Sequence, residues 1–554
     1  MLRFRLKYIF SGHNILILGM LCLFGVSHAQ VVNGVITESD TTIIAADTIS
    51  RIGDLPNRKT TKVFLEHTDI LEFNKLLRNE AKFLKGNVVF RHNDSYMYCD
   101  SAYFFEQTNS LEAFSNVRME QGDTLFIYGD YLFYDGNTEI AKLRNNVRMI
   151  NKDVTLYTDS LNYDRYINIG YYFDHGRIVD PENTLRSIYG QYSPDTKIAE
   201  FKDSVVLENP QFTLYSDTLK YNTDSKIATI LGPSEIVSDS ATIISSLGWY
   251  NTITNESMLL DQSVVVSGTK LLSGDSIFYN RELGFGEVFG NMSIKDTAQQ
   301  VMLTGNYGYY NEKTQFAFAT DSALLYEYSQ QDTLFLHADT MTMVTIDEKF
   351  KEIKAYHGVR FFRPDLQGVC DSMQFNSKDS VLYMFQDPIL WNETYQLSGD
   401  TIEVFLNDST IDWAHVIASA FAIQEIDSVS YNQLGGSDLK AFFQNQTVER
   451  LEVSGNAESV FYPIDDKNGS FIGMNKTKSG YLTMWMRDSK LDKLKIWPSP
   501  QGTLTPIPDL TREARFLKNF QWFDYIRPIN KEDLFRVVKR KVEEAPKRKR
   551  KSLN

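Results

Sequence analysis

The chain has 554 residues, a formal net charge of −14, 13% aromatic residues and only 14 prolines. The acidic balance argues against a nucleic-acid partner, because such a partner requires a basic surface that displaces counterions. The segments between turns are rich in Val, Ile, Thr, Tyr and Phe, which is the composition of β-strands.

Residues 1–29 have the pattern of a secretory signal peptide. Basic residues within the first seven positions precede an apolar stretch from about residue 15 to residue 26, and Ser27-His28-Ala29 has the small-x-small form of a cleavage site. No later segment approaches the roughly 20 consecutive apolar residues of a membrane-spanning helix. We expect an exported protein in which residues 30–60, rich in Thr, Ser and Asp, form a flexible leader.

A motif of about 30 residues recurs from about residue 80 to residue 405. Its first half reads small-Asn-Val, as in Gly-Asn-Val at 86–88 and Ser-Asn-Val at 115–117. Its second half reads small-Asp-x-apolar-x-Tyr, as in the segments that end at Tyr134 and Tyr163. A repeat of this size with alternating apolar residues indicates stacked β-units that bury one another's apolar faces.

The apolar positions change phase at the Asp of each repeat. They lie one and three residues before the Asp but two and four residues after it, and strand side chains alternate with period two. A β-bulge or a sharp corner produces such a phase change. The predicted structural bulge residues are Asp100, Asp130, Asp159, Asp217, Asp275, Asp371 and Asp400.

Each repeat is therefore predicted to be a strand pair whose bent strand points apolar side chains to one side along its whole length. The predicted inward columns consist of Leu125, Ile127, Leu132, Tyr134, Leu156, Leu161, Tyr163, Leu214, Leu219, Tyr221, Leu272, Ile277 and Tyr279. The predicted fold is all-β, an elongated jellyroll or β-roll of strand-pair repeats of about 30 residues, with a short, partly helical C-terminal tail.

This repeat behind a signal peptide resembles the LptA/OstA family of lipopolysaccharide transport proteins, and residues 438–463 and 473–486 are similar to longer OstA-like proteins. The resemblance implies a β-jellyroll, V-shaped in section, that shields lipid acyl chains. It implies that the inward columns line an apolar lipid groove, with an ordinary filled core as the alternative for each residue.

The same resemblance implies a location and partners. The location is the periplasm, with association with the outer membrane as an option. The implied ligand is lipopolysaccharide or a similar glycolipid, and the implied partners are inner- and outer-membrane transport components, with end-to-end self-association as a further option.

We divide the expected array into OstA-like jellyroll repeats at 61–260 and 261–410, a further OstA-like strand region at 411–490, and a C-terminal segment at 491–554. Residues 412–422 fit a strand pair or a short helix. From Thr511 onward the apolar spacing is helical, with Pro528 between two segments. The basic run at 547–551 fits either a solvated tail or a contact with phosphate-rich lipid.

Catalytic motifs are not found in the sequence. The eight histidines are scattered, neither a nucleophile elbow nor a phosphate-binding loop occurs, and Cys99 and Cys370 are expected to be small buried residues. We expect no cofactor, no metal and no enzyme activity. The leading hypothesis is a periplasmic lipid-binding bridge. A structural or adhesive β-solenoid is the alternative, and a carbohydrate-active β-helix is the third.

Overall fold

The computed structural model describes residues 61–73, 81–329, 332–347, 349–407, 410–445, 447–465, 469–487 and 490–538. All of them belong to one compact unit that begins at Thr60. The expected signal peptide, flexible leader and basic run lie outside the described residues. Among the described residues, no helix is long and apolar enough to cross a membrane.

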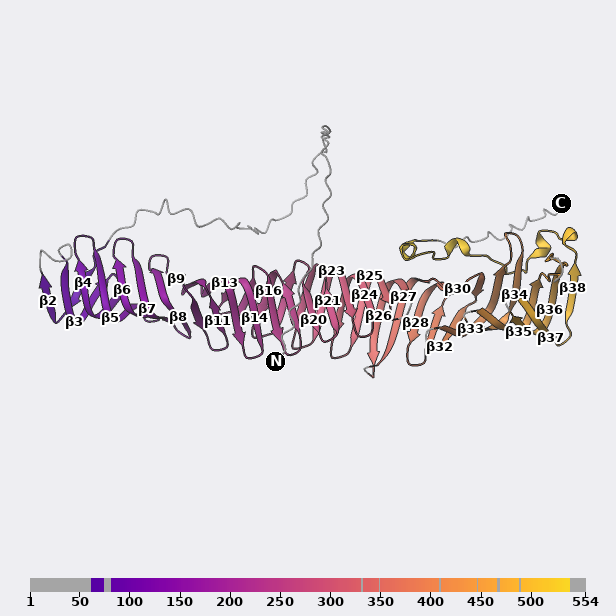
Figure 1. Ribbon diagram of the computed structural model, residues 1–554, viewed down its shortest axis with the longest axis horizontal. Coiled ribbons are helices and arrows are strands. Elements are labelled where there is room, and N and C mark those ends of the chain that lie inside the picture. Colours follow the sequence, from indigo (N-terminus) through magenta and orange to yellow (C-terminus); the bar gives the residue numbers. More distant parts are fainter. Residues whose placement is uncertain are drawn as a thin grey trace, which may run out of the picture. The chain divides into compact units, whose positions relative to one another are not determined.

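The described strands form one 38-stranded antiparallel sheet, in which successive segments of the chain pair with one another (Figure 1). This confirms the predicted all-β, elongated jellyroll. The sheet continues without a break across residue 260, where β19 pairs with β22, and across residue 410, where β33 begins directly after β32 and pairs with it.

Eighteen strands have 11 or more residues: β3 (Lys82–His92), β4 (Ser95–Phe105), β5 (Ser110–Gln121), β6 (Leu125–Asp135), β7 (Ile140–Asn151), β8 (Val154–Asp164), β13 (Ile198–Asn209), β14 (Phe212–Asn222), β23 (Phe285–Asp296), β24 (Val301–Asn311), β25 (Phe316–Glu327), β26 (Leu334–Ile346), β27 (Phe350–Arg363), β28 (Leu366–Asn376), β33 (Thr410–Glu425), β34 (Tyr431–Gln444), β35 (Thr447–Phe461) and β36 (Met474–Arg487).

The other strands are shorter: β1 (Phe64–His67), β2 (Ile70–Phe73), β9 (Ile169–Tyr172), β10 (Gly176–Val179), β11 (Thr184–Ser187), β12 (Tyr189–Ser193), β15 (Ile227–Ile230), β16 (Ser234–Ser238), β17 (Thr242–Ser245), β18 (Leu247–Asn251), β19 (Glu256–Leu260), β20 (Val264–Ser267), β21 (Lys270–Ser273), β22 (Ser276–Asn280), β29 (Val381–Phe385), β30 (Ile389–Asn392), β31 (Tyr395–Ser398), β32 (Thr401–Asn407), β37 (Lys490–Trp497) and β38 (Gln501–Thr505).

Each long strand bends near its middle, and the bends define a line that we call the corner. In β6 the buried residues are at 125, 127 and 129 before the bend and at 132 and 134 after it. The strand therefore belongs to two layers. We call the layer that contains residues 131–135 the first arm and the layer that contains residues 125–129 the second arm. Most of the short strands lie in one arm only, because there the strand is interrupted at the corner.

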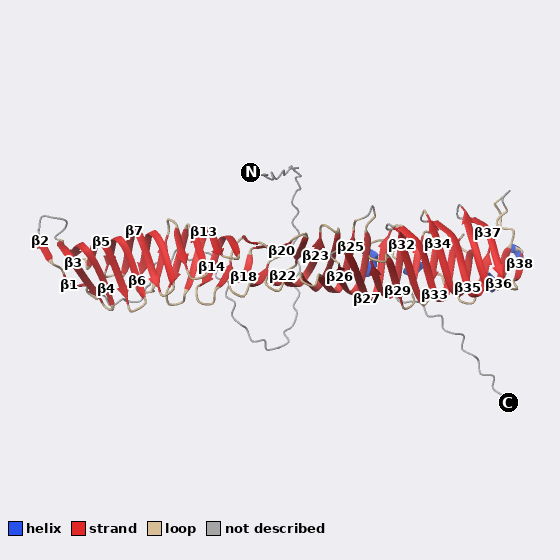
Figure 2. Ribbon diagram, turned by 90° about the horizontal axis from the view of Figure 1, so that it is seen from below, coloured by secondary structure: helices blue, strands red, loops and turns tan. Residues whose placement is uncertain are grey.

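The two arms face each other across one apolar core, and Figure 2 shows the stacked strands from below. Phe90 of the second arm lies 5.4 Å, between ring centroids, from Phe104 of the first arm. Phe212 and Tyr250 make the same contact at 4.8 Å farther along the chain. The sides of the arms that lie opposite the corner carry the hairpin turns, and we call this side the mouth.

Residues 412–422, which the sequence left open between a strand pair and a helix, lie within the single strand β33. Strands also extend past residue 490, through β37 and β38 to Thr505. From there to residue 538 the described helical elements are 3-10 turns. They are η2 (Ile507–Asp509), η3 (Glu513–Arg515), η4 (Asp524–Ile526) and η5 (Glu532–Phe535).

The segment 506–538, which we call the strap, covers the outer face of the second arm near the C-terminal end. In β33, Ala420 and Ala422 belong to the core between the arms, whereas Phe421 and Ile423 point outward and pack with Leu517 of the strap. The strap is held by buried glutamines: Gln396 Oε1 accepts from the Phe523 backbone N at 2.8 Å. The apolar residues after Thr511, whose spacing suggested helices, thus cover the outer face of a sheet.

Candidate lipid-binding interior

The thirteen inward residues that the sequence singled out are all buried between the arms, each 5% exposed or less. They belong to one continuous core that extends from Val63 to Met484. Side chains fill this interior. The voids near its C-terminal end, lined by Tyr395, Ala422 and Leu451, measure about 30 and 10 Å³.

The corner contains a repeated hydrogen bond between Asn and Asp. Asn146 Nδ2 donates to Asp130 Oδ2 at 2.6 Å, and Asn116 Nδ2 donates to Asp100 Oδ2 at 2.7 Å. Asn291 makes the same contact with Asp275 at 2.9 Å. Each bond joins neighbouring strands, so the corner is a ladder of polar contacts that holds consecutive bends in register.

The extra residue of each corner lies on the small-Asn segment. Ser115 and Asn116 of β5 stand opposite the single residue Asp130 of β6. Both have positive φ, 63° and 49°, a conformation that Asn tolerates better than most residues. The phase of the buried side chains changes at Asp130, on the partner strand.

The other predicted corner Asp residues lie at corresponding places. The backbone N of Asp400 donates to the carbonyl of Ala418 at 3.1 Å, and that of Asp217 donates to Pro233 at 3.2 Å. Asp159 Oδ1 accepts from the Asn146 backbone N at 3.2 Å. Of the seven, Asp371 alone is half-buried and the rest are exposed.

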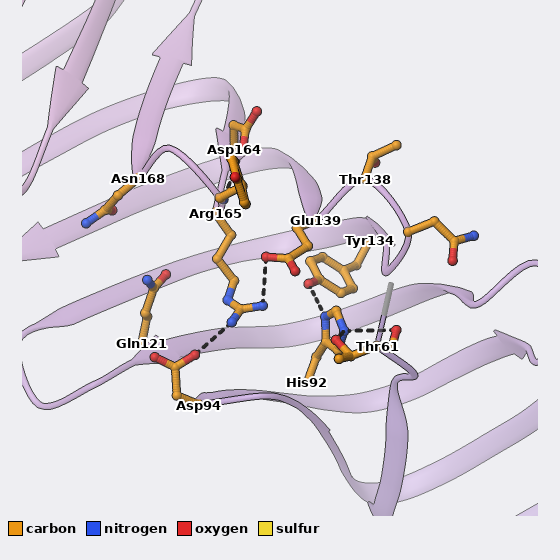
Figure 3. A network of polar contacts seen from close by, with 12 residues as sticks. Thr61, His92, Asp94, Gln121, Tyr134, Thr138, Glu139, Asp164, Arg165 and Asn168 are labelled. Atoms are coloured by element: carbon orange, nitrogen blue, oxygen red, sulfur yellow. Dashed lines mark hydrogen bonds and ion pairs between the residues drawn. The ribbon is translucent and has the colours of Figure 1, made fainter. Parts of the chain in front are cut away.

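The mouth is closed by polar contacts between the turns of the two arms. In the first of these clusters, Arg165 Nη2 donates to Asp94 Oδ1 at 2.7 Å and Nη1 donates to Glu139 Oε2 at 3.2 Å (Figure 3). Asp94 is in a turn of the second arm, whereas Arg165 and Glu139 are in turns of the first. The guanidinium therefore connects the arms.

His92 and Tyr134 close the same part of the mouth. His92 Nδ1 lies 2.6 Å from Tyr134 Oη, and Nε2 lies 3.2 Å from the carbonyl oxygen of Thr61. Burial, and secondarily the charge of Arg165, lower the pKa of His92. The contacts fit a neutral imidazole that donates from Nε2 and accepts the Tyr134 hydroxyl proton at Nδ1.

Further contacts between the arms repeat along the mouth. Together with the Arg165 and His92 contacts we call them the latches. They are Tyr163 Oη to Gln121 Oε1 at 2.5 Å, Asn151 Nδ2 to Tyr192 Oη at 3.1 Å, Tyr221 Oη to Asp180 Oδ2 at 2.7 Å, Lys226 Nζ to Asp180 Oδ2 at 2.8 Å, Arg281 Nη2 to Gln211 Oε1 at 2.6 Å, and Lys270 to Tyr310.

The tyrosines of the inward columns thus have a second role that the sequence reasoning missed. Tyr134, Tyr163 and Tyr221 were assigned as groove lining, but their hydroxyls are latch groups at the mouth. Burial raises the pKa of Tyr134 to about 12 and raises the pKa of Tyr163 and Tyr221 as well, so the hydroxyls remain proton donors. The signal was available, because a buried Tyr has a hydroxyl to satisfy that Phe lacks. The hydroxyl of Tyr279, in the same columns, is buried without a hydrogen-bond partner among the described residues.

Among the described residues, no group of His, Cys, Asp and Glu is arranged to hold a metal ion. Cys99 and Cys370 are buried at the corner, directly before Asp100 and Asp371. Burial raises the pKa of the Cys99 thiol to about 12, which disfavours a reactive thiolate at this position.

Comparison with known families identifies the N-terminal part of this architecture. Residues 60–217 and 211–275 match the model of the OstA-like protein family. Over these residues the chain is similar to OstA-like proteins. The match covers the corner ladder at Asp100 and Asp130 and most of the latches.

Thirteen solved chains match this chain. One is described as LptH, the LptA homologous periplasmic component of the conserved lipopolysaccharide transport device from Pseudomonas aeruginosa. It is 13% identical with a TM-score of 0.20, and the match covers 26% of this chain and 95% of LptH. No curated protein matches the chain.

Proposed function

We propose that this protein is a non-catalytic, lipid-binding bridge that carries lipopolysaccharide or a similar glycolipid across the periplasm, with the acyl chains between the two arms. The observation that carries the proposal is the continuous apolar core closed at the mouth by hydrogen bonds and ion pairs, within an OstA-like chain. A covalent or apolar closure would bar lipid from the interior, whereas polar latches can exchange with water as they open.

The closed interior makes opening of the mouth a required step. A latch hydrogen bond contributes about 0.5–1.5 kcal/mol. Each buried acyl CH₂ contributes about 0.8 kcal/mol, so ten methylenes supply roughly 8 kcal/mol. A single acyl chain can therefore compensate for the loss of several neighbouring latches, and the latches can close again behind a lipid that slides onward.

The proposed path follows the repeats. Residues 61–260 and 261–410 would form the two halves of the conduit, and residues 411–490 would continue it. The partners would be inner- and outer-membrane transport components at the two ends, with end-to-end self-association as an additional arrangement. The inward residues from Leu125 to Tyr279 are the proposed lipid contacts.

Photo-crosslinking in cells that make lipopolysaccharide tests the proposal. A photoreactive residue is placed at Ile127, Leu161 or Leu219, which are buried, and at Lys142 or Lys220 on the outer surface as controls. We expect lipopolysaccharide adducts from the inward positions alone. Adducts at none of the inward positions, or equal adducts at the outer controls, would contradict the proposal.

A structural or adhesive β-solenoid is the second candidate. The filled interior favours it, because a core packed to less than 5% exposure at nearly every inward residue is sufficient for a scaffold. In that case the crosslinker at Leu161 would react only with residues of the same chain.

A further inference from the structure

A row of tyrosine and arginine side chains crosses the outer face of the second arm. Its members are paired directly, each with the next, on consecutive strands. They are Tyr98 (β4), Arg118 (β5), Tyr128 (β6), Arg148 (β7), Tyr157 (β8), Arg177 (β10) and Arg186 (β11). We call this set the Tyr-Arg row.

The arginines lie against the tyrosine rings. The guanidinium carbon is 4.3 Å from the ring centroid for Arg118 over Tyr98, and 4.8 Å for Arg148 over Tyr128. Arg177 is 4.8 Å from the centroid of Tyr157. These contacts hold the planar cations in place, and a guanidinium fixed in this way loses little freedom when it binds an anion.

Part of the positive charge in the row is uncompensated. Arg118 is paired with Glu120 and Arg186 with Glu208, both at 3.1 Å. Arg148 and Arg177 are exposed, and neither has an ion pair with a carboxylate in the part of the chain that the structure describes. The chain has a net charge of −14. These two exposed cations, each stacked on a tyrosine ring, are therefore a local exception to its acidic character.

The row lines a groove beside the corner. The groove has a volume of about 820 Å³, and its lining includes Tyr128, Arg148, Tyr157, Arg177 and Arg186 together with Asn146, Asp159 and Asp174. A second hollow of about 630 Å³ continues along the same register, over Val206, Tyr215, Glu235, Ile244 and Val264. The outer face thus combines cations, aromatic rings, apolar patches and a single carboxylate along one line.

We propose that this groove binds an anionic polysaccharide. Guanidinium groups form paired hydrogen bonds with carboxylates and phosphates, and the exposed ring of Tyr215 in the second hollow can pack against the C–H face of a sugar ring. Strands are about 4.8 Å apart, so arginines on alternate strands recur roughly every 10 Å, which suits a chain with an acidic group on alternate sugars.

A single-stranded nucleic acid fits the groove less well. It carries a phosphate at every nucleotide, and Asp159 and Asp174 in the groove wall would repel a continuous line of phosphates. A polysaccharide with intermittent charge can place its neutral hydroxyls beside these carboxylates. The proposal is independent of lipid binding between the arms, because the row faces outward.

Calorimetric titration of the full chain tests the proposal with hyaluronate, which carries a carboxylate on alternate sugars, as the anionic probe, dextran as the neutral probe and poly(dT) as the nucleic-acid probe. We expect saturable binding of hyaluronate, and at least a tenfold weakening in the double variant Arg148→Ala/Arg177→Ala. The matched control is Lys142→Ala/Lys440→Ala, which removes two exposed cations stacked on aromatic rings of the first arm. This control should bind like the unmodified chain.

Several outcomes would overturn the proposal. They are no saturable binding of hyaluronate by the unmodified chain, equal binding of dextran, or equal weakening in the control variant. Tighter binding of poly(dT) than of hyaluronate would reassign the groove to nucleic acid. Since both double variants alter only exposed side chains, their thermal unfolding midpoints should match that of the unmodified chain, which separates lost binding from lost folding.

Discussion

The Arg165 guanidinium bonds to the carboxylate of Asp94, 71 residues earlier in the chain, and thereby joins the turns of two facing arms. The arginine side chain is 7% exposed and that of Asp94 is 67% exposed. The contact therefore lies at the rim of the core, where a cation emerges from the apolar interior to meet its partner in water. Other latches, such as Tyr221 Oη to Asp180 Oδ2, also join the two arms but are buried.

Replacing Arg165 with Met should loosen the mouth. It leaves Glu139, which is largely buried, without its partner, and we expect a loss of about 1–3 kcal/mol in stability. Hydrogen exchange should increase in β3, β4, β7 and β8. Arg186→Ala is the control, because its ion pair with Glu208 is exposed and contributes less than about 1 kcal/mol. Equal effects of both substitutions would contradict the latch assignment.

Mild acid should weaken the His92 latch. The folded-state pKa of His92 lies below its ordinary value of 6.5, so the unfolded chain takes up the proton first as the pH falls. Stability linked to His92 is therefore present above pH 6.5 and is lost as the pH falls through the folded-state pKa. The unfolding midpoint should fall between pH 7.5 and pH 5.5 by more in the unmodified chain than in His92→Gln. An identical fall in both would show that other groups dominate.

Substitutions at the corner should separate the hydrogen bond from the backbone conformation. Asp130→Ala removes one exposed hydrogen bond from Asn146 and should cost about 0.5–1.5 kcal/mol. Asn146→Val also places a β-branched residue at φ 52°, and the cost should rise by a further 1–2 kcal/mol or so. Chemical denaturation measures both. If Asn146→Val costs no more than Asp130→Ala, the left-handed conformation is not what selects Asn.

Replacing two latch tyrosines with phenylalanine should open the mouth to lipid. Tyr163→Phe/Tyr221→Phe keeps the apolar rings but removes the hydroxyls that bond to Gln121 and Asp180. We expect a higher yield of lipid adducts from a crosslinker at Leu161. Tyr307→Phe, which removes a first-arm hydroxyl bonded to Glu287 on the neighbouring strand, is the control. An unchanged or lower yield in the double variant would argue against opening at the mouth.

Removal of the strap should expose an apolar surface. A chain that ends at Thr505 loses the contacts that bury Phe421, Ile423 and Trp391 on the outer face of the second arm. We expect self-association in analytical ultracentrifugation and a red shift of tryptophan fluorescence. Gln396→Ala, which removes the acceptor of the Phe523 backbone N, should produce a weaker form of the same change. A monomeric truncated chain with unchanged fluorescence would mean that the strap does not protect this face.

The sequence by itself determined the repeat, the bend at each Asp and the inward phase of residues such as Ile127 and Leu132. These features are encoded locally, because period-two alternation, a small residue before Asp and an Asn that accepts positive φ act within a few residues. The same local patterns predicted strands up to residue 490 and indicated helices after Thr511.

Only the tertiary structure decided which distant residues meet. Arg165 meets Asp94, Tyr221 meets Asp180, and Arg148 lies between Tyr128 and Tyr157, because the strand register and the lengths of the turns bring them together. The strap likewise forms 3-10 turns where its sequence suggested helices, since its apolar residues are matched to the outer face of a sheet. The physical reason is that local patterns specify which face a side chain takes, whereas long-range pairing specifies its neighbours.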